Sequence, residues 1–182
     1  MLDKNLLLVD IGGTNIRYAY SNIGDSDFVS ENKAELDSLN DFDNLISMLL
    51  ADSCVKNIVF SVAGPKVNNS IKMTNRNFEI DADEIRKRFN LESCYLLNDW
   101  ESIGYSIRTF SENDFDNFKD GEPFNDTFLV IGPGTGLGAS VISDNNVIAT
   151  EIGNTNLGLS ALKSLLEINS CLLYTSPSPR DP

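Results

Sequence analysis

Histidine is absent from this 182-residue chain, and cysteine is scarce, with three residues that lie far apart and form no Cys-x-x-Cys pair. These two absences exclude a zinc site built from cysteine and histidine side chains. They also exclude any catalytic mechanism that uses a histidine base. A general base in this protein must therefore be a carboxylate, a lysine or a tyrosine.

The chain also lacks long apolar runs, and it has few basic residues relative to acidic ones. No run approaches the roughly 20 apolar residues that span a bilayer, and the amino terminus lacks the features of a secretory signal peptide, so we expect a cytoplasmic protein. The chain has 14 basic and 27 acidic residues, which gives a net charge of −13. General nucleic-acid binding and docking on anionic lipid both need a basic surface. We therefore expect neither a nucleic-acid partner nor a membrane partner.

The chain has enough apolar material for a packed core, since 41% of its residues are hydrophobic. Short apolar runs and alternating apolar patterns predict strands at 5–11, 16–21, 28–36, 57–64, 71–75, 78–80, 94–99, 128–132, 137–143 and 147–153. Helical spacing of apolar residues predicts helices at 38–52, 81–90, 99–107 and 158–168. This mixture of strands and helices predicts the α/β class.

Two changes in composition suggest how the chain is divided. The polar, acidic stretch 108–127 is interpreted as a crossing between two lobes, so 1–107 forms a smaller α/β lobe and 108–170 begins a larger one. The last residues, CLLYTSPSPRDP (171–182), are rich in proline and serine and resemble a translated sequencing adapter. The alternative is a native disordered tail. If the adapter interpretation holds, the native sequence stops near residue 170 and the chain is an amino-terminal fragment.

Glycines alternate through FLVIGPGTGLGA (128–139), directly after an apolar strand. Such bare backbone is typical of close approach to a phosphate group. A dinucleotide fingerprint needs a helix after the glycines, whereas the pattern here predicts a hairpin, and the Gly-Lys-Ser/Thr ending of a P-loop is absent. A second strand, glycine turn and strand occur at LLVDIGGTNIRYAY (7–20). Two such turns resemble those with which the actin, heat-shock ATPase and sugar kinase superfamily holds ATP phosphates.

Five motifs at compatible spacing carry a closer resemblance. They are DIGGTNIR (10–17), SVAGP (61–65), MTNRNFEID (73–81), LLNDW (96–100) and IGPGTGLG (131–138). Together they resemble the bacterial glucokinase family, which comprises ATP-dependent hexokinases. The resemblance runs from residue 6 to about residue 157. It implies the two-lobed, actin-like ATPase fold (ribonuclease H-like), with the first lobe nearly complete and the second truncated.

The resemblance also implies roles for individual residues. Asp99 corresponds to the catalytic base and Asp10 to the carboxylate that holds Mg²⁺ beside the ATP phosphates. The first phosphate turn corresponds to Gly12, Gly13, Thr14 and Asn15, and the second to Gly132, Gly134, Thr135, Gly136 and Gly138. The sugar-binding residues correspond to Asn98, Asp99, Gly136, Glu151 and Asn154. Asn154 stands where the family usually has histidine, and this departure leaves the preferred hexose open.

Chemistry supports a carboxylate base independently of the resemblance. A sugar hydroxyl is a poor nucleophile at neutral pH, and a carboxylate that accepts its proton typically accelerates transfer by about 10²–10⁴-fold. Asp99 stands where a strand gives way to a helix, so a plain helix-capping role is the alternative. Glu151 taken alone would be a surface acid more often than not.

The sequence therefore predicts a glucokinase. It would transfer the γ-phosphoryl group of Mg·ATP to the 6-hydroxyl of glucose and give glucose 6-phosphate and ADP, the first step of glycolysis. The alternatives are a kinase for another hexose and a non-catalytic sugar-responsive protein on the same fold. The fragment itself is expected to be inactive, and the full-length form is compatible with a homodimer.

Overall fold

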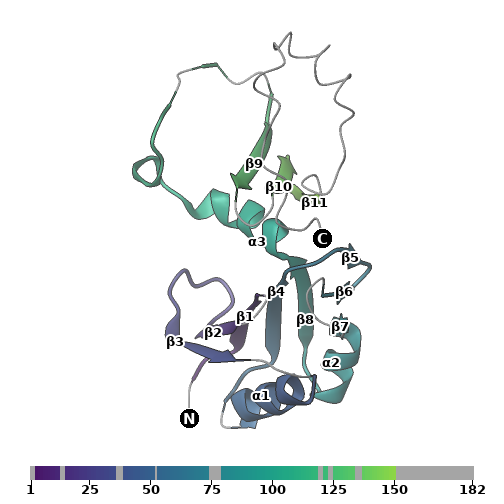
Figure 1. Ribbon diagram of the computed structural model, residues 1–182. Coiled ribbons are helices and arrows are strands. Elements are labelled where there is room, and N and C mark those ends of the chain that lie inside the picture. The colour runs from purple at the N-terminus through teal and green to yellow at the C-terminus, as the bar shows by residue number, and fades with distance from the viewer. Residues whose placement is uncertain are drawn as a thin grey trace. The chain divides into compact units, whose positions relative to one another are not determined.

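The chain forms two compact units, residues 1–102 and 103–182. The computed structural model describes residues 3–12, 15–35, 39–51, 53–73, 79–118, 121–122, 125–133 and 137–150 (Figure 1). The boundary between the units falls within helix α3 (Asp99–Ser106), slightly before the lobe boundary at 107/108 that the sequence suggested.

The first unit is built on a five-stranded sheet with the order β3-β2-β1-β4-β8. Its strands are β1 (Leu6–Ile11), β2 (Asn15–Ser21), β3 (Val29–Glu35), β4 (Asn57–Val62) and β8 (Ser93–Asn98). β1 pairs antiparallel with β2 and parallel with β4, and β4 pairs parallel with β8. The carboxyl ends of β1, β4 and β8 therefore meet at one edge of the sheet.

Two helices complete the core of this unit, α1 (Leu39–Ala51) and α2 (Ala82–Arg88). Phe42 of α1 packs against Phe60 of β4, with ring centroids 5.8 Å apart. The hydroxyl of Tyr20 on β2 donates to the backbone oxygen of Leu49 on α1, and burial raises the pKa of this tyrosine. These helices and strands lie where the periodicity predicted them, so these predictions are confirmed.

Helix α2 begins at the cap that its sequence predicts. The carboxylate of Asp81 accepts a hydrogen bond from the backbone N–H of Glu84 at 2.9 Å. Acidic residues occupy the first turn and basic residues the last, which suits the helix dipole.

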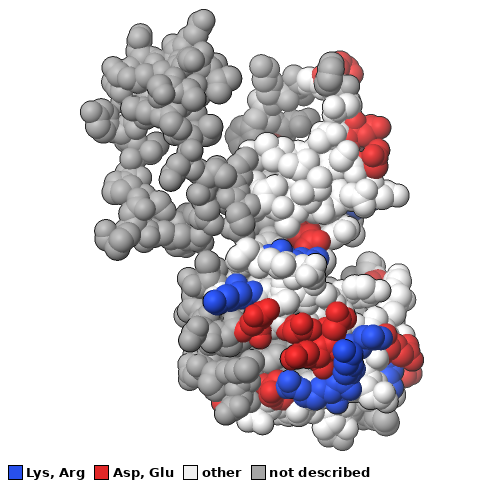
Figure 2. Space-filling model, turned by 90° about the vertical axis from the view of Figure 1, so that its right-hand side faces the viewer, with Lys and Arg blue, Asp and Glu red and all other residues white. Residues whose placement is uncertain are grey.

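On the face drawn in Figure 2, the described basic side chains lie among acidic ones.

A small three-stranded sheet, β5-β6-β7, connects β4 to α2. Its strands are β5 (Lys66–Val67), β6 (Ser70–Lys72) and β7 (Glu79–Asp81). β6 pairs antiparallel with both neighbours, and the buried Ile71 and Ile80 face each other across the β6–β7 pair. The turn between β4 and β5 thus enters a hydrogen-bonded structure immediately at Lys66.

The second unit contains an antiparallel sheet with the order β11-β10-β9. Two short 3-10 turns, Ile107–Thr109 and Glu112–Asp114, precede β9 (Thr127–Pro133), β10 (Leu137–Ser143) and β11 (Asn146–Thr150). A strand follows the glycine-rich loop, so the predicted hairpin is confirmed. The helix predicted at 158–168 and the tail at 171–182 lie outside the described residues. Within the described part of the chain, no helix is long and apolar enough to cross a bilayer.

Candidate functional site

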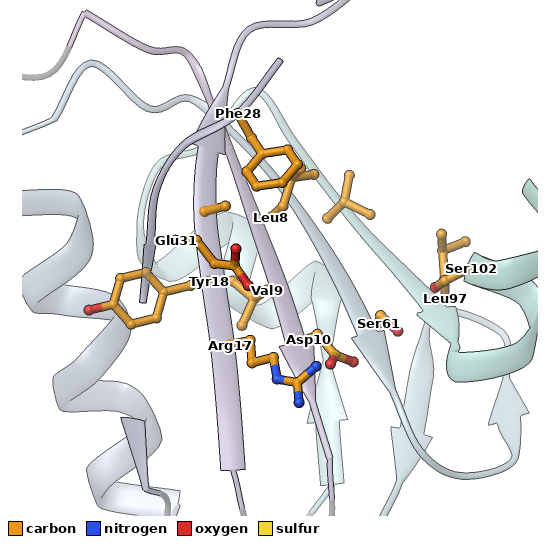
Figure 3. Close-up of a pocket in the computed structure, with 12 residues that line it drawn as sticks. Leu8, Val9, Asp10, Arg17, Tyr18, Phe28, Glu31, Ser61, Leu97 and Ser102 are labelled. Carbon is orange, nitrogen blue, oxygen red and sulfur yellow. The ribbon is translucent and has the colours of Figure 1, made fainter. Parts of the chain in front are cut away.

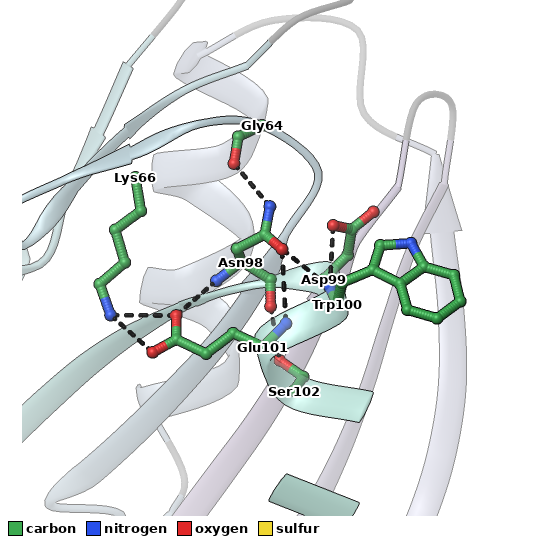
Figure 4. Close-up of polar contacts among 7 residues, drawn as sticks. All are labelled: Gly64, Lys66, Asn98, Asp99, Trp100, Glu101 and Ser102. Carbon is green, nitrogen blue, oxygen red and sulfur yellow. Dashed lines mark hydrogen bonds and ion pairs between the residues drawn. The ribbon is translucent and has the colours of Figure 1, made fainter. Parts of the chain in front are cut away.

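The junction between β8 and α3 holds the two adjacent residues to which the sequence assigned sugar binding. β8 ends at Asn98 and α3 begins at Asp99. The side-chain oxygen of Asn98 accepts hydrogen bonds from the backbone N–H groups of Trp100 at 2.9 Å and Glu101 at 3.4 Å. In return, Oε2 of Glu101 accepts from the backbone N–H of Asn98 at 3.1 Å (Figure 4). This reciprocal arrangement is a capping box, with Asn98 as the N-cap.

Asp99 therefore occupies the first position of the helix, next to the residue that caps it. Its Oδ1 accepts from the backbone N–H of Trp100 at 2.9 Å, and its side chain is half-buried. The sequence left a capping role open for Asp99, whereas the reciprocal capping bonds with Glu101 belong to Asn98. Figure 4 shows the carboxylate of Asp99 pointing away from the side chain of Glu101.

The same junction is tied to the turn that follows β4. The side-chain N–H of Asn98, which is only 2% exposed, donates to the backbone oxygen of Gly64 at 2.8 Å. Gly64 has a φ of +152°, and a Cβ atom there would lie 2.7 Å from the backbone oxygen of Lys72. Only glycine fits this position without a shift of the backbone.

An ion pair joins the same two segments. Nζ of Lys66, on β5, lies 3.2 Å from Oε1 and 3.1 Å from Oε2 of Glu101. The Glu101 side chain is 10% exposed and that of Lys66 is 26% exposed, so the pair is largely shielded from water. The sequence reasoning missed both residues. The spacing of Asn98 and Glu101 in NDWE fits a capping box and could have identified Glu101, whereas no local pattern indicates Lys66.

Asp10 lies near the carboxyl end of β1 and is exposed. In the sheet it is level with Arg17 of β2 and Ser61 of β4. Ser61 directly precedes Val62, which pairs with Asn98 of β8. The carboxylate proposed for Mg²⁺ and the junction at Asp99 are therefore at the same edge of the sheet.

A cavity of about 350 Å³ lies over one face of this sheet (Figure 3). Its lining includes the apolar residues Leu8, Ala19, Val59, Leu97 and Phe28. Figure 3 shows Phe28 toward one end of the cavity and Asp10 with Arg17 toward the other. Asp99 does not line it. Because neither Asn98 nor Asp99 lines the cavity, we do not assign it as the sugar site.

The donor set at Asp10 is compatible with magnesium. In the described part of the chain, no three carboxylate or thiolate side chains converge on a common point that could hold a metal ion. Mg²⁺ bound with a nucleotide needs only one or two carboxylates, because water and phosphate oxygens complete its shell. A single exposed carboxylate at the end of β1 meets this requirement.

The two glycine turns are described in part. The backbone N–H of Gly12 donates to the backbone oxygen of Asn15 at 3.0 Å and closes the hairpin between β1 and β2. Gly132 of β9 is paired with Gly138 of β10 in the second hairpin. Seven predicted site residues lie outside the described residues, namely Gly13, Thr14, Gly134, Thr135, Gly136, Glu151 and Asn154. Their roles, like those of the other predicted site residues, stay predictions.

Comparison with a solved structure identifies the class of fold. A glucokinase from an Antarctic psychrotroph matches with a TM-score of 0.67 at 24% sequence identity, over 92% of this chain and 56% of that chain. At this identity the likeness shows the fold alone. The chain has the mixed α/β, actin-like ATPase fold of sugar kinases, as the sequence predicted.

Comparison of sequences identifies the family. A model of the Glucokinase family matches residues 7–168. The glucokinase of Colwellia psychrerythraea is 33% identical over 150 residues, which cover 77% of this chain and 44% of the relative. That of Nostoc punctiforme is 30% identical over 140 residues, or 73% of this chain and 41% of the relative.

The chain belongs to the glucokinase family, so the resemblance carried by the five motifs is confirmed. It spans less than half the length of these two relatives.

Proposed function

We propose that this chain carries the base and phosphate-binding residues of an ATP-dependent hexose kinase whose substrate is glucose. The observation that carries the proposal is the junction of β8 and α3, where the capping box holds Asp99 at the first position of the helix. The half-buried carboxylate of Asp99 lies at the same sheet edge as Asp10. Membership of the glucokinase family supports the same chemistry.

In the proposed reaction, the 6-hydroxyl oxygen of glucose attacks the γ-phosphorus of ATP. The new O–P bond forms as the bond between the γ-phosphorus and the β,γ-bridging oxygen breaks, and ADP leaves. The hydroxyl proton passes to the carboxylate of Asp99. A carboxylate that orients the hydroxyl and accepts its proton contributes typically about 10²–10⁴-fold to such a transfer.

The neighbouring residue contributes binding in this scheme. The side-chain nitrogen of Asn98 carries two N–H groups, and one of them donates to Gly64. We assign the other to a hydroxyl of the sugar. On the family resemblance alone, we assign Glu151 and Asn154 to the binding of further sugar hydroxyls. On the same basis, the backbone of Gly136 is assigned to a position beside the sugar.

The phosphate groups are assigned to the two glycine turns. In the turns at 12–15 and 132–138, backbone N–H groups other than that of Gly12, which donates to Asn15, would bind phosphate oxygens, and Asp10 would hold Mg²⁺. Pro133 has no N–H group to contribute. The ion, when bound, neutralises charge on the phosphates. Local donors of this kind make ATP binding compatible with a net charge of −13.

A kinase for another hexose is the second candidate. It is favoured by Asn154, which stands where the family usually has histidine. Asparagine can hydrogen-bond a sugar hydroxyl but cannot carry a positive charge. A cytoplasmic location, a homodimer and the lack of a nucleic-acid partner also stay predictions.

The test compares wild type with Asp99→Asn in the protein extended to the length of its relatives. ADP release is measured with glucose, with its 2- and 4-epimers, and without sugar, while calorimetry measures sugar binding. We expect Asp99→Asn to lower kcat by about 10²–10⁴-fold, with the Kd for sugar unchanged within a few-fold. Asp83→Asn, at an exposed carboxylate of α2, is the control and should retain wild-type kcat. Near-wild-type turnover in Asp99→Asn would refute the base assignment, and faster turnover with an epimer would favour the second candidate.

A further inference from the structure

We propose that the ion pair between Lys66 and Glu101 is a positioning device for Asp99, an inference that rests on the proposed function. Neither residue is assigned any contact with sugar or phosphate. The pair acts through the backbone of the first turn of α3, which carries Asp99. Its effect would be to hold the carboxylate where it can accept the proton of the sugar hydroxyl.

Glu101 makes two kinds of contact at once. Its Oε2 accepts from the backbone N–H of Asn98 at 3.1 Å and from Nζ of Lys66 at 3.1 Å. Its Oε1 accepts from the same Nζ at 3.2 Å. The carboxylate therefore links the helix cap to Lys66, which lies 35 positions earlier in the chain.

Lys66 is anchored in the small sheet that follows β4. Lys66 is the first residue of β5. In the antiparallel pair of β5 and β6, it lies opposite the buried Ile71. The neighbouring Gly64 accepts the side-chain hydrogen bond of Asn98. The turn after β4 thus holds the β8–α3 junction at two points, once through a hydrogen bond and once through an ion pair.

The energetics of a shielded ion pair also favour a positioning role. An ion pair that is shielded from water gains little over an apolar pair of the same size, whereas loss of one partner leaves an uncompensated charge. A capping box alone needs only the reciprocal hydrogen bonds between Asn98 and Glu101. The added lysine fixes the direction of the Glu101 side chain. Positioning of this kind matters because a displacement of about 1 Å at a reacting group can lower the rate by 10²-fold.

Four variants of the extended protein test the inference by steady-state kinetics. In Glu101→Gln and Lys66→Met we expect kcat to fall by about 10–100-fold, while KM for the hexose stays within about 3-fold of wild type. Lys66→Arg keeps the charge and should recover kcat to within about 3-fold of wild type. Asp43→Asn breaks the exposed pair between Arg88 and Asp43 and should leave both constants unchanged.

A second measurement needs no activity and uses the 182-residue chain itself. Amide hydrogen exchange at 98–101 should accelerate by about tenfold or more in Glu101→Gln, because local opening of the first turn becomes easier. Exchange in β4 should be unchanged, which separates a local effect from loss of the fold. Equal exchange at 98–101 in the two proteins would overturn the inference.

The kinetic outcomes separate the inference from the proposed function. If wild type transfers no phosphate to any hexose, or if Asp99→Asn is as active as wild type, the proposed function fails and the inference fails with it. If Asp99→Asn is impaired but Glu101→Gln and Lys66→Met keep wild-type kcat, only the inference fails. A lower thermal midpoint with unchanged kcat in the folded protein would also overturn it, because that result indicates a purely structural pair.

Discussion

Replacement of Gly64 by alanine should destabilise the first unit at the β4–β5 turn, which is hydrogen-bonded to the β8–α3 junction of the candidate site. The added Cβ would lie 2.7 Å from the backbone oxygen of Lys72 and 3.1 Å from Cγ2 of Ile71, at a φ of +152°. Residues in sparsely populated backbone regions cost about 1–3 kcal/mol, and overpacking typically adds about 1–3 kcal/mol. Movement of the turn would also weaken the 2.8 Å bond from Asn98. We expect the free energy of unfolding to fall by about 3 kcal/mol.

Equilibrium unfolding in urea measures this loss. Trp100 is the only tryptophan in the chain and belongs to the first unit, so its fluorescence reports the unit that contains Gly64. The shift of the midpoint at constant m-value gives the change in stability. The matched control is Gly24→Ala, because Gly24 also has a positive φ, +90°, but the described residues place no atom within 4 Å of an added Cβ. It should lose only about 1 kcal/mol, from backbone strain.

The decisive quantity is the difference between Gly64→Ala and Gly24→Ala in the loss of free energy of unfolding. If Gly64→Ala loses no more stability than Gly24→Ala, the close approach of the Lys72 backbone does not limit the residue at position 64. The β4–β5 turn would then not be a rigid support for Asn98. Loss of the fluorescence transition altogether would instead indicate that the turn is required for the unit to fold.

Two further predictions concern buried groups. Burial, with a smaller contribution from Asp83, raises the pKa of the Cys94 thiol to about 12 from 9.0. The unfolded chain releases this proton at lower pH than the native one, so the free energy of unfolding should fall as pH rises from about 9 toward 12. Urea unfolding should show a shallower fall in Cys94→Ala, and equal slopes would contradict the assignment. In the second unit, the buried hydroxyl of Ser140 has no hydrogen-bond partner among the described residues. Ser140→Ala should therefore be neutral or stabilise by up to about 1 kcal/mol in thermal unfolding, and a clear loss of stability would indicate a partner for the hydroxyl.

The sequence predicted the local structure well because local structure depends on nearby residues. The apolar runs of β1 and β4 and the helical spacing of apolar residues in α1 can be recognised in the sequence. The cap of α2 at Asp81 also depends on a residue only three positions away. The order of the five motifs was enough to indicate the family and, through it, the fold.

The environment of the site could not be predicted in the same way. The contacts that hold Asn98 and Glu101 come from Gly64 and Lys66, which are 34 and 35 positions earlier in the chain. They meet only because β4 lies beside β8 in the sheet, with Val62 paired to Asn98. No periodicity encodes which strands become neighbours, since that choice depends on how the whole core packs.

Asp99 illustrates the difference between what the sequence predicts and what the tertiary structure determines. The sequence showed its residue type, its motif and its place between a strand and a helix, and these features suggested either a catalytic base or a helix cap. The tertiary structure decided that the reciprocal cap belongs to Asn98 and Glu101, and that a lysine from a separate turn supports it. The sequence by itself thus determined the elements, the family and the candidate residues. Only the packing of distant segments determined what holds those residues in place, because hydrogen bonds and ion pairs form between whichever groups the folded backbone brings within about 3 Å.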